Sequence, residues 1–467
     1  MLEEAEYYLN SIPANQSDIL LELKKNIAMT YMSLSLFEKA LPHLEAVLSM
    51  QIINSGEDCV EVLRTQNMLI KLLLEIEDYA KAKAMIQELL NEKFNEYSEN
   101  DPVKIETLYY HAVTLGYEGK YKEAEEILRR TTALRSRILG EDHLDTLCTK
   151  RTLGLILERQ LKFRDARKIF DDVLYIAKTK YGLEHPDTIE TMKNIAILLK
   201  MEGRFSESEI MLREVVKNST KTLGLNHYRT ISAEISLSIV LMNRDNKKEA
   251  EEILKSILKR NVNKNGIKHK NILFPKILLA KILAEKGKIQ ECKNLLIEYH
   301  DLIPEDLEDI NTKILSTMNE VARVLLNIGE LGEAERILTK NISMMVVKNS
   351  ERFMLDTLIV RNLLTCVLIE RGKLEEAEAT INENLDISLS ILECDHPLTL
   401  NFMNTLGSVY ARQSRFEEAI SVLSDCLEKQ KSVLGADHPH SLNTMNNISH
   451  VLLKQKEYKH KKNSVND

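Results

Sequence analysis

A period of 42 residues runs through almost the whole 467-residue chain and limits the folds that it can adopt. Its clearest marker is a small residue that recurs at this spacing, with one extra residue before the ninth occurrence: Ala40, Ala82, Ala124, Ala166, Ser208, Ala250, Cys292, Ala334, Ala377 and Ala419. A second column of mostly small residues lies twelve positions earlier: Ala28, Ala112, Gly154, Ala196, Ser238, Ala280, Ala322 and Gly407. Such a period indicates stacked copies of one structural unit rather than two or three globular domains.

Each unit has the pattern of two amphipathic helices. Apolar residues recur at i, i+3 and i+4 around the two columns, as in Leu153, Leu157, Ile169 and Phe170. An aromatic residue precedes the first column by three positions in six units: Phe37, Tyr79, Tyr121, Phe163, Phe205 and Phe416. Small residues let helix backbones approach closely, and the aromatic ring fills the gap where the next unit stacks. The pattern therefore predicts an all-α solenoid of stacked helix-turn-helix units.

These columns resemble those of the tetratricopeptide repeat, which is usually about 34 residues long. The longer unit, with linkers such as 223–227 (LGLNH), is similar to the variety found in kinesin light chains and nephrocystin-type proteins. The resemblance covers nearly the whole chain and implies a right-handed superhelical solenoid that binds other proteins. Kinesin light chains join their motor through a heptad coiled coil ahead of the repeats. This sequence shows no such segment, so the resemblance leaves attachment to a motor open.

The period also predicts how the chain is divided. We expect a partial repeat with only a second helix at 1–17, repeats one to five at 18–229, degenerate repeats six and seven at 230–313, repeats eight to ten at 314–439, a C-terminal capping helix at 440–459 and a basic tail at 460–467. Lys247 and Ile289 replace the aromatic residue in the two degenerate repeats. Weaker stacking there favours a hinge, whereas different side chains that pack equally well would leave the solenoid rigid. The partial first repeat is either a cap or part of a longer protein.

Composition excludes several classes of function. The formal net charge is −8, and the 63 basic and 71 acidic residues are interspersed, which gives no reason to expect nucleic acid or membrane binding. The six cysteines lack metal-ligand spacing, and no signal peptide or long apolar run is present. We therefore expect a cytoplasmic protein without a cofactor or a metal. Neither a phosphate-binding loop nor a nucleophile motif occurs, so we expect no enzymatic activity.

Six of the twelve histidines also follow the period: His143, His185, His227, His269, His396 and His438. Stacked helix layers lie about 10 Å apart, whereas zinc binds nitrogen ligands at about 2 Å. Neighbouring members of this column therefore cannot share a zinc ion. We expect each histidine to bond instead to the exposed amino-terminal end of the helix that follows it.

The resemblance implies that the first helix of each unit lines a concave groove. Its groove positions lie fifteen and eleven residues before the first small column, and one turn earlier. In the C-terminal repeats these and adjacent positions are rich in asparagine and predict a peptide-binding site: Asn319, Arg323, Asn362, Asn401, Asn404, Ser408, Arg412, Asn443 and Asn446. An asparagine amide both donates and accepts, which suits the backbone of an extended peptide. The alternative is that these residues only keep the helix face hydrated.

The N-terminal half of the groove has a different character. Its predicted lining is basic: Arg64, Asn67, Lys71, Arg151, Arg159 and Lys193, with Tyr109 among them. An acidic segment of a partner would suit this surface, and a solvated helix face without a ligand is the alternative.

The sequence as a whole predicts a non-enzymatic adaptor or scaffold that binds a peptide or domain of another protein in its concave groove. The alternative is an architectural subunit that assembles through its ends or its convex face, including by self-association. Neither the partner nor the oligomeric state follows from the sequence.

Overall fold

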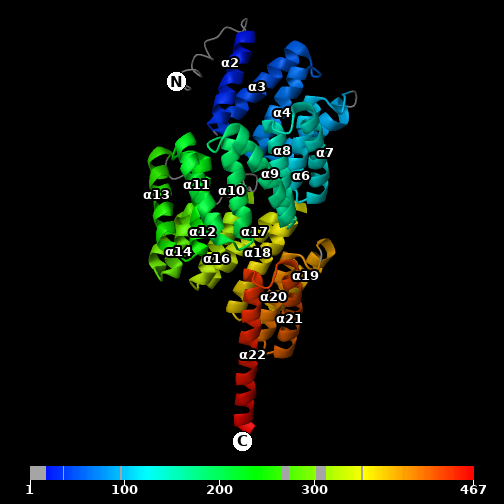
Figure 1. Ribbon diagram of the computed structural model, residues 1–467. Helices are drawn as coiled ribbons and strands as arrows, with labels where there is room; N and C mark the ends of the chain where they lie inside the picture. Colours follow the sequence, from blue (N-terminus) through cyan, green and yellow to red (C-terminus); the bar gives the residue numbers. More distant parts are fainter. Residues whose placement is uncertain are drawn as a thin grey trace. The chain divides into compact units, whose positions relative to one another are not determined.

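The computed structural model describes residues 17–34, 36–94, 97–265, 273–300, 312–348, 351–392 and 394–466. All regular elements within these ranges are helices, as the all-α prediction requires (Figure 1). The chain forms two compact units. Unit 1 comprises Met1–Leu198 and Met211–Ser232, and unit 2 comprises Leu199–Ile210 and Ala233–Asp467. The predicted partial repeat at 1–17 lies, apart from Ser17, outside the described residues.

Unit 1 alternates first and second helices of successive repeats. The first helices are α2 (Ser17–Ser33), α4 (Val60–Glu75), α6 (Pro102–Tyr117), α8 (Leu144–Arg159) and most of α10 (Pro186–Met201). The second helices are α3 (Phe37–Ser55), α5 (Tyr79–Glu88) with the π-helical turn η1 (Leu89–Lys93), α7 (Tyr121–Leu139), α9 (Phe163–Tyr181) and most of α11 (Phe205–Leu223). The boundary between the units passes through α10, α11 and α12 (Tyr228–Asn243).

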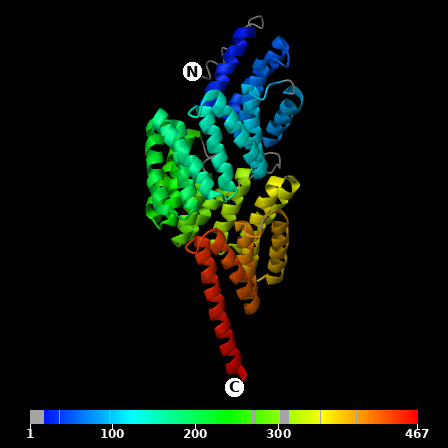
Figure 2. The same cartoon turned by 45° about the vertical axis from the view of Figure 1, so that its right-hand side comes forward.

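Unit 2 continues the same alternation. Its first helices are α14 (Leu273–Glu285), α16 (Thr312–Asn327), α18 (Glu351–Glu370), α20 (Pro397–Arg412) and α22 (Pro439–Asn466). Its second helices are α13 (Lys247–Asn265), α15 (Ile289–His300), α17 (Leu331–Lys348), α19 (Leu374–Ile391) and α21 (Phe416–Val433). Figure 2 shows α22 as one long helix, which runs through the residues predicted to form the capping helix and the basic tail.

The two small columns lie where helices pack most closely. Ala124, Ala166 and Ala419 of the first column are completely buried. In the second column, a Cβ atom added to Gly407 would lie 2.5 Å from Cγ of Leu423 in α21, so no side chain fits there. The predicted close approach of helix backbones is therefore confirmed.

The first helices begin at the histidine column. Nδ1 of His143, His185, His227, His396 and His438 accepts a hydrogen bond from the backbone N–H two residues later, at 3.2–3.3 Å. Each of these histidines thus caps a helix whose first N–H groups have no intrahelical partner. The structural role predicted for the column is confirmed for these five residues, while His269 lies outside the described residues.

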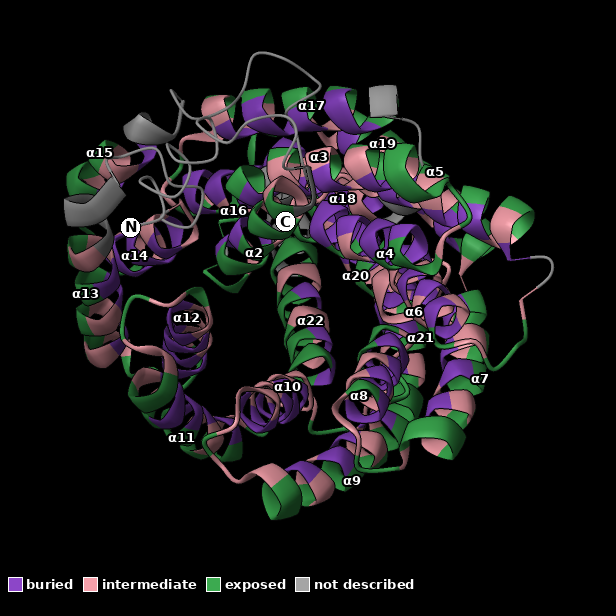
Figure 3. Ribbon diagram, turned by 90° about the horizontal axis from the view of Figure 1, so that it is seen from above, coloured by how far each residue is buried: buried purple, intermediate pink, exposed green. Residues whose placement is uncertain are grey.

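Second helices pack between two first helices, as α7 does with α6 and α8 in unit 1, and α21 with α20 and α22 in unit 2. First helices also contact one another, for example α6 with α8 and α18 with α20. Within unit 1, Figure 3 shows α8 and α10 on the inner side of α9 and α11. We call the side of the first helices that points away from the second helices the inner face. Within the described residues, no helix is long and apolar enough to cross a membrane.

Candidate functional site

The predicted peptide-binding residues of unit 2 lie on the first helices α16, α18, α20 and α22. We call these nine residues the asparagine face: Asn319, Arg323, Asn362, Asn401, Asn404, Ser408, Arg412, Asn443 and Asn446. Asn401, Asn443 and Asn446 are exposed, whereas Asn404 and Ser408 are half-buried. Their side chains therefore offer amide groups to solvent along α20 and α22.

Two asparagines of this face already have amide partners within the protein. Oδ1 of Asn319 accepts a hydrogen bond from Nδ2 of Asn341 in α17 at 2.6 Å. Oδ1 of Asn404 accepts one from Nδ2 of Asn447 in α22 at 3.1 Å. These bonds fix the orientation of both side chains and use part of their bonding capacity.

Asn362 differs from its neighbours because it is 92% buried and its Oδ1 has no hydrogen-bond partner among the described residues. A buried acceptor without a partner costs about 1–3 kcal/mol. It stands in α18 at the same register position as Asn404 in α20 and Asn446 in α22. An unsatisfied acceptor therefore lies in line with two asparagines that are accessible from the inner face.

The arginines of the asparagine face are paired at the surface. Arg412 bonds to Glu370 of α18 at 2.5 Å, and Arg323 lies 3.6 Å from Glu320 in its own helix. Both arginines are exposed, so these pairs add little stability and can exchange for a partner's carboxylate. Burial raises the pKa of the nearby Cys366 thiol, although the charge of Arg323 acts in the opposite direction.

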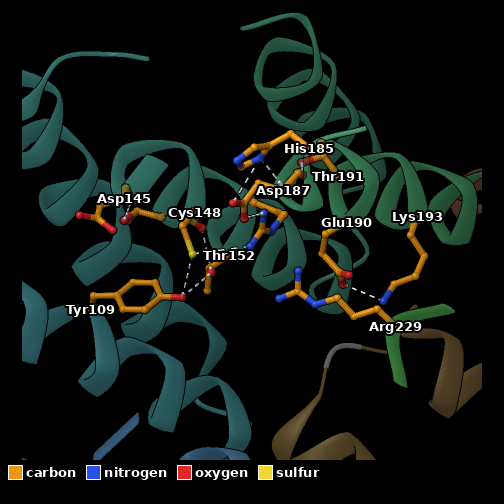
Figure 4. Close-up of polar contacts among 12 residues, drawn as sticks. Tyr109, Asp145, Cys148, Thr152, His185, Asp187, Glu190, Thr191, Lys193 and Arg229 are labelled. Atoms are coloured by element: carbon orange, nitrogen blue, oxygen red, sulfur yellow. Dashed lines mark hydrogen bonds and ion pairs between the residues drawn. The ribbon is translucent and has the colours of Figure 1, made fainter. Parts of the chain in front are cut away.

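In unit 1 the inner face holds a polar network instead of an asparagine row (Figure 4). The hydroxyl of Tyr109 in α6 lies 3.2 Å from Oγ1 of Thr152 and 3.4 Å from Sγ of Cys148, both in α8. Burial and the adjacent Cys148 raise the pKa of Tyr109, so its hydroxyl stays protonated. Arg135 of α7 lies over the tyrosine ring at 4.9 Å. Tyr109 thus links two successive repeats and is held on both sides.

The predicted cations Arg151 and Lys193 lie in this network, and both have acidic partners. Arg151 Nη1 of α8 bonds to Asp187 of α10 at 2.8 Å, and Lys193 Nζ lies 2.7 Å from Glu190 in its own helix. Burial opposes ionisation of Glu190, but Lys193 and Arg151 outweigh it and hold the pKa of that carboxyl below its usual range. Within these pairs the positive charge of the predicted basic groove is neutralised.

Arg229 of α12 was missed by the sequence analysis. Figure 4 shows it beside Glu190 and Lys193, and its Nε donates to the hydroxyl of Tyr228 at 3.0 Å. The charges of Glu190 and Asp187 contribute to a raised pKa of Arg229 despite its burial. A signal for it exists in the sequence. The residue two positions after the capping histidine is Asp145 in α8 and Asp187 in α10, where the helix dipole favours an anion, but an arginine at this point in α12.

The remaining residues of the predicted basic groove divide into two groups. Arg64, Lys71 and Arg159 are exposed. Asn67 is placed differently from the prediction, because it is completely buried: its Nδ2 donates to the carbonyl of Val103 at 3.0 Å and its Oδ1 accepts from Thr107 at 2.7 Å. Both partners lie in the next first helix, so Asn67 joins two repeats and offers nothing to a ligand. No group of three acidic, histidine or cysteine side chains that could hold a metal ion occurs among the described residues.

Comparison with a family model identifies repeats in two segments of the chain. The model of the tetratricopeptide repeat matches residues 104–174, 147–221, 366–432 and 402–460. The sequence matches none of the curated proteins with which it was compared.

Several solved structures are similar to this chain. A putative kinesin light chain of Podosopora anserina with nearly identical TPR-like repeats is 21% identical, with a TM-score of 0.39 over 43% of this chain and 96% of that one. BtubC from P. vanneervenii is 15% identical, with a TM-score of 0.38 over 50% of this chain and 91% of that one. The apo form of the quorum sensor NprR from B. thuringiensis is 17% identical, with a TM-score of 0.48 over 79% of this chain and 99% of that one. We transfer no residue role from these proteins.

The matched segments fall in both units, and the same pair of helices recurs through the described parts of the chain between and around them. The segments 104–221 and 366–460 of this chain are tetratricopeptide repeats.

Proposed function

We propose that this protein is a non-enzymatic interaction scaffold, and that the asparagine face of unit 2 binds an extended segment of a partner protein. Tetratricopeptide repeats are typically protein-interaction modules rather than catalysts. The observation that carries the proposal is the group of exposed amides of Asn401, Asn443 and Asn446 on α20 and α22.

An extended peptide supplies what this face lacks. The exposed amides of Asn401, Asn443 and Asn446 can both donate to and accept from its peptide groups. Neighbouring first helices lie about 8–10 Å apart, which corresponds to about three residues of an extended chain at roughly 3.3 Å each. One asparagine in each repeat therefore matches the spacing of backbone groups whatever the partner's side chains are.

Acidic residues of the partner would be bound by cations that the protein does not use internally. Arg151 and Lys193 are committed to Asp187 and Glu190, so we assign this role in unit 1 to the exposed Arg64, Lys71 and Arg159. This contact is electrostatic and should weaken as salt is added.

We also propose a cytoplasmic location. All six cysteines have free thiols. Free thiols without disulfides are usual in reducing compartments.

The double substitution Asn401→Ala/Asn446→Ala tests the proposal. It removes two exposed amides, so the free protein should be about as stable as the wild type. The proteins that the tagged chain captures from a cell extract, identified by mass spectrometry, should be lost or strongly reduced.

Asn384→Leu is the matched control. Asn384 is a completely buried asparagine of α19 whose Nδ2 lies 3.5 Å from the carbonyl of Leu358, away from the inner face. Its replacement should lower the stability and leave the captured proteins unchanged. Capture of the same proteins by the wild type and by Asn401→Ala/Asn446→Ala would contradict the proposal.

A further inference from the structure

A pocket of about 600 Å³ lies between helices α7 and α8 of unit 1. Five residues of α7 line it, together with Glu141 of the following turn and with Lys150 and Leu153 of α8. We call this the α7–α8 pocket. Its volume lies within the range of roughly 300–1,000 Å³ that is usual for sites of small ligands. Its lining residues belong neither to the asparagine face nor to the cations that we assign to an acidic partner.

The pocket coincides with a change at one apolar position of the repeat. The position eight residues after the first small column holds a leucine, isoleucine or valine in eight units: Leu48, Leu90, Leu174, Val216, Leu258, Ile342, Leu385 and Leu427. In α7 this position holds Thr132, and in the seventh unit it holds His300. Leu48, Leu90 and Leu385 pack against the apolar core around them. The smaller side chain of Thr132 lines the pocket instead and leaves room that an aliphatic residue would fill.

The wall of the pocket that α8 supplies is changed as well. Lys150 stands sixteen residues before the first small column, on the first helix of the next unit. The same position holds Met192, Met403 and Met445 in the units that follow Leu174, Leu385 and Leu427. A leucine–methionine pair of these units is thus replaced by Thr132 and Lys150, and in no other pair of successive units are both positions polar. Where other helix pairs have two apolar side chains, α7 and α8 form a polar pocket.

The lining of the pocket carries more positive than negative charge. Among the described residues that line it, Arg129, Arg137 and Lys150 are cationic and Glu141 alone is acidic. Glu141 accepts a hydrogen bond from Lys150, which holds the pKa of that carboxyl below its usual range, so the carboxylate stays ionised at neutral pH. The lining therefore has two positive charges more than negative ones.

Residues outside the pocket neutralise its two arginines only in part. Nη2 of Arg137 donates to Oδ1 of Asn100, which is a neutral group. Nη2 of Arg129 lies 2.8 Å from Glu125, but that carboxylate also pairs with Lys162 at 2.9 Å. Both arginines are exposed, and exposed pairs contribute little stability, so their guanidinium groups can turn towards a ligand.

We infer that the α7–α8 pocket binds a phosphate monoester. At neutral pH such a group carries a charge of about −1.5 to −2, which matches the excess of positive charge in the lining. Its oxygens suit the planar guanidinium groups of Arg129 and Arg137. Ala133 and Leu153 also line the pocket and offer apolar atoms to the carbon part of the ester. The inference does not depend on peptide binding, since the asparagine face lies in unit 2 and the pocket in unit 1.

Isothermal titration calorimetry of the full chain with phenyl phosphate tests the inference, and benzoate is the matched monocarboxylate. We expect phenyl phosphate to bind at least about tenfold more tightly than benzoate at low salt, and its affinity to fall as salt is added. N-acetyl-phosphoserine amide represents a second source of the same group, a phosphorylated protein side chain. Tighter binding of phenyl phosphate would assign a small-molecule ester, and tighter binding of the phosphoserine derivative would assign a phosphorylated protein. Binding of neither ester, or binding of benzoate as tight as that of the esters, would overturn the inference.

Two variants locate the site. Thr132→Leu restores the aliphatic residue of the other units without a change in charge, and Arg137→Gln removes one cation. Each should weaken the binding of the tighter ester by at least about tenfold, the first by filling the pocket and the second by removing a charge-assisted contact. Urea unfolding should show that Thr132→Leu is at least as stable as the wild type, because it adds apolar contact in an open space.

Arg130→Gln is the matched control. Arg130 is the neighbour of Arg129 in α7, is exposed, and pairs with Glu99 outside the pocket. Its replacement should change the affinity by less than about twofold. An unchanged affinity in either Thr132→Leu or Arg137→Gln would overturn the inference, and so would an equal loss in Arg130→Gln and Arg137→Gln.

Discussion

A Cβ atom on Gly154 would lie 2.5 Å from Cε1 of Phe170, which is closer than non-bonded carbon atoms approach one another in proteins. The two residues belong to the second small column of α8 and to the buried face of α9, and the ring is completely buried. Gly407 and Leu423 have the same relationship in α20 and α21. The small residue of each such pair is therefore required by the large one that faces it.

Gly154→Ala should lower the free energy of unfolding by about 1–2 kcal/mol, because overpacking against a fixed ring costs more than the gain in helix propensity returns. Gly332→Ala in α17 is the control, since nothing lies within 4 Å of its added Cβ. That change should leave the stability equal or raise it by up to about 1 kcal/mol. Urea unfolding of both variants checks this, and equal effects would contradict the packing argument.

The turns between the paired helices give a second prediction. Gly372 and Ser414 occupy equivalent turns with φ of 77° and 63°, and a left-handed conformation is unfavourable for residues that carry a Cβ. Ser414→Gly should raise the stability by about 0.5–1 kcal/mol, and Gly372→Ala should lower it by about 1 kcal/mol. Nothing lies within 4 Å of a Cβ on Gly372, so a loss of stability in Gly372→Ala would reflect the unfavourable backbone conformation and not a steric clash. Melting temperatures that change in the same direction for Ser414→Gly and Gly372→Ala would contradict this account.

The histidine caps predict a dependence on pH. His227 Nδ1 accepts the N–H of Arg229 at 3.2 Å, and protonation would remove this acceptor. Burial, assisted by the charge of Arg229, lowers the pKa of His227 in the folded protein below its usual value of about 6.5. Its contribution is therefore present above about pH 6.5 and is lost as the pH falls through that value towards the lowered pKa.

His227→Asn should keep a cap that does not titrate. Between pH 7.5 and 5.5 the variant should lose less stability than the wild type, by up to about 1 kcal/mol. Denaturant unfolding at the two pH values measures this difference. Identical losses in the two proteins would show that the cap at His227 does not titrate in this range.

The cations of unit 1 should fall into two classes. Arg151→Ala breaks a largely buried ion pair with Asp187 and should cost about 1–3 kcal/mol of stability. Arg64→Ala removes an exposed charge and should change the stability by less than about 0.5 kcal/mol. The second variant should instead weaken the binding of an acidic partner at low salt. Similar stability losses in both variants would contradict the division into structural and ligand-binding cations.

The comparison of Asn67, Tyr109 and Arg151 shows how far the sequence predicts the site. All three stand at the same position of their repeats, and each side chain bonds to the next first helix, at Val103, Thr152 and Asp187. The period predicts which side of the helix this position occupies. It does not predict how deeply the side chain is buried, which depends on its partner in the next repeat and on its own length. Asn67 is short and finds a carbonyl in the core.

The fold was predictable for a different reason. Close helix contacts favour a small residue such as Gly407 at the same position of most units, so the packing can be recognised in the sequence as a constant spacing. The histidine caps were predictable because a helix begins at the same point of each repeat. The exposure of Leu442 and Leu452 on α22 was not predictable, because the corresponding positions in the preceding repeats hold large apolar residues that are mostly buried.

The central claim, binding of a partner along the asparagine face, is tested most directly by photo-crosslinking in cells. A photoreactive residue would replace Asn401 or Asn446 on the inner face, or the exposed Leu389 of α19 on the opposite side of unit 2. The account predicts that the two inner-face positions crosslink to one short segment of the same protein, and that Leu389 does not. Crosslinks of that protein to Leu389, with none at Asn401 and Asn446, would contradict it.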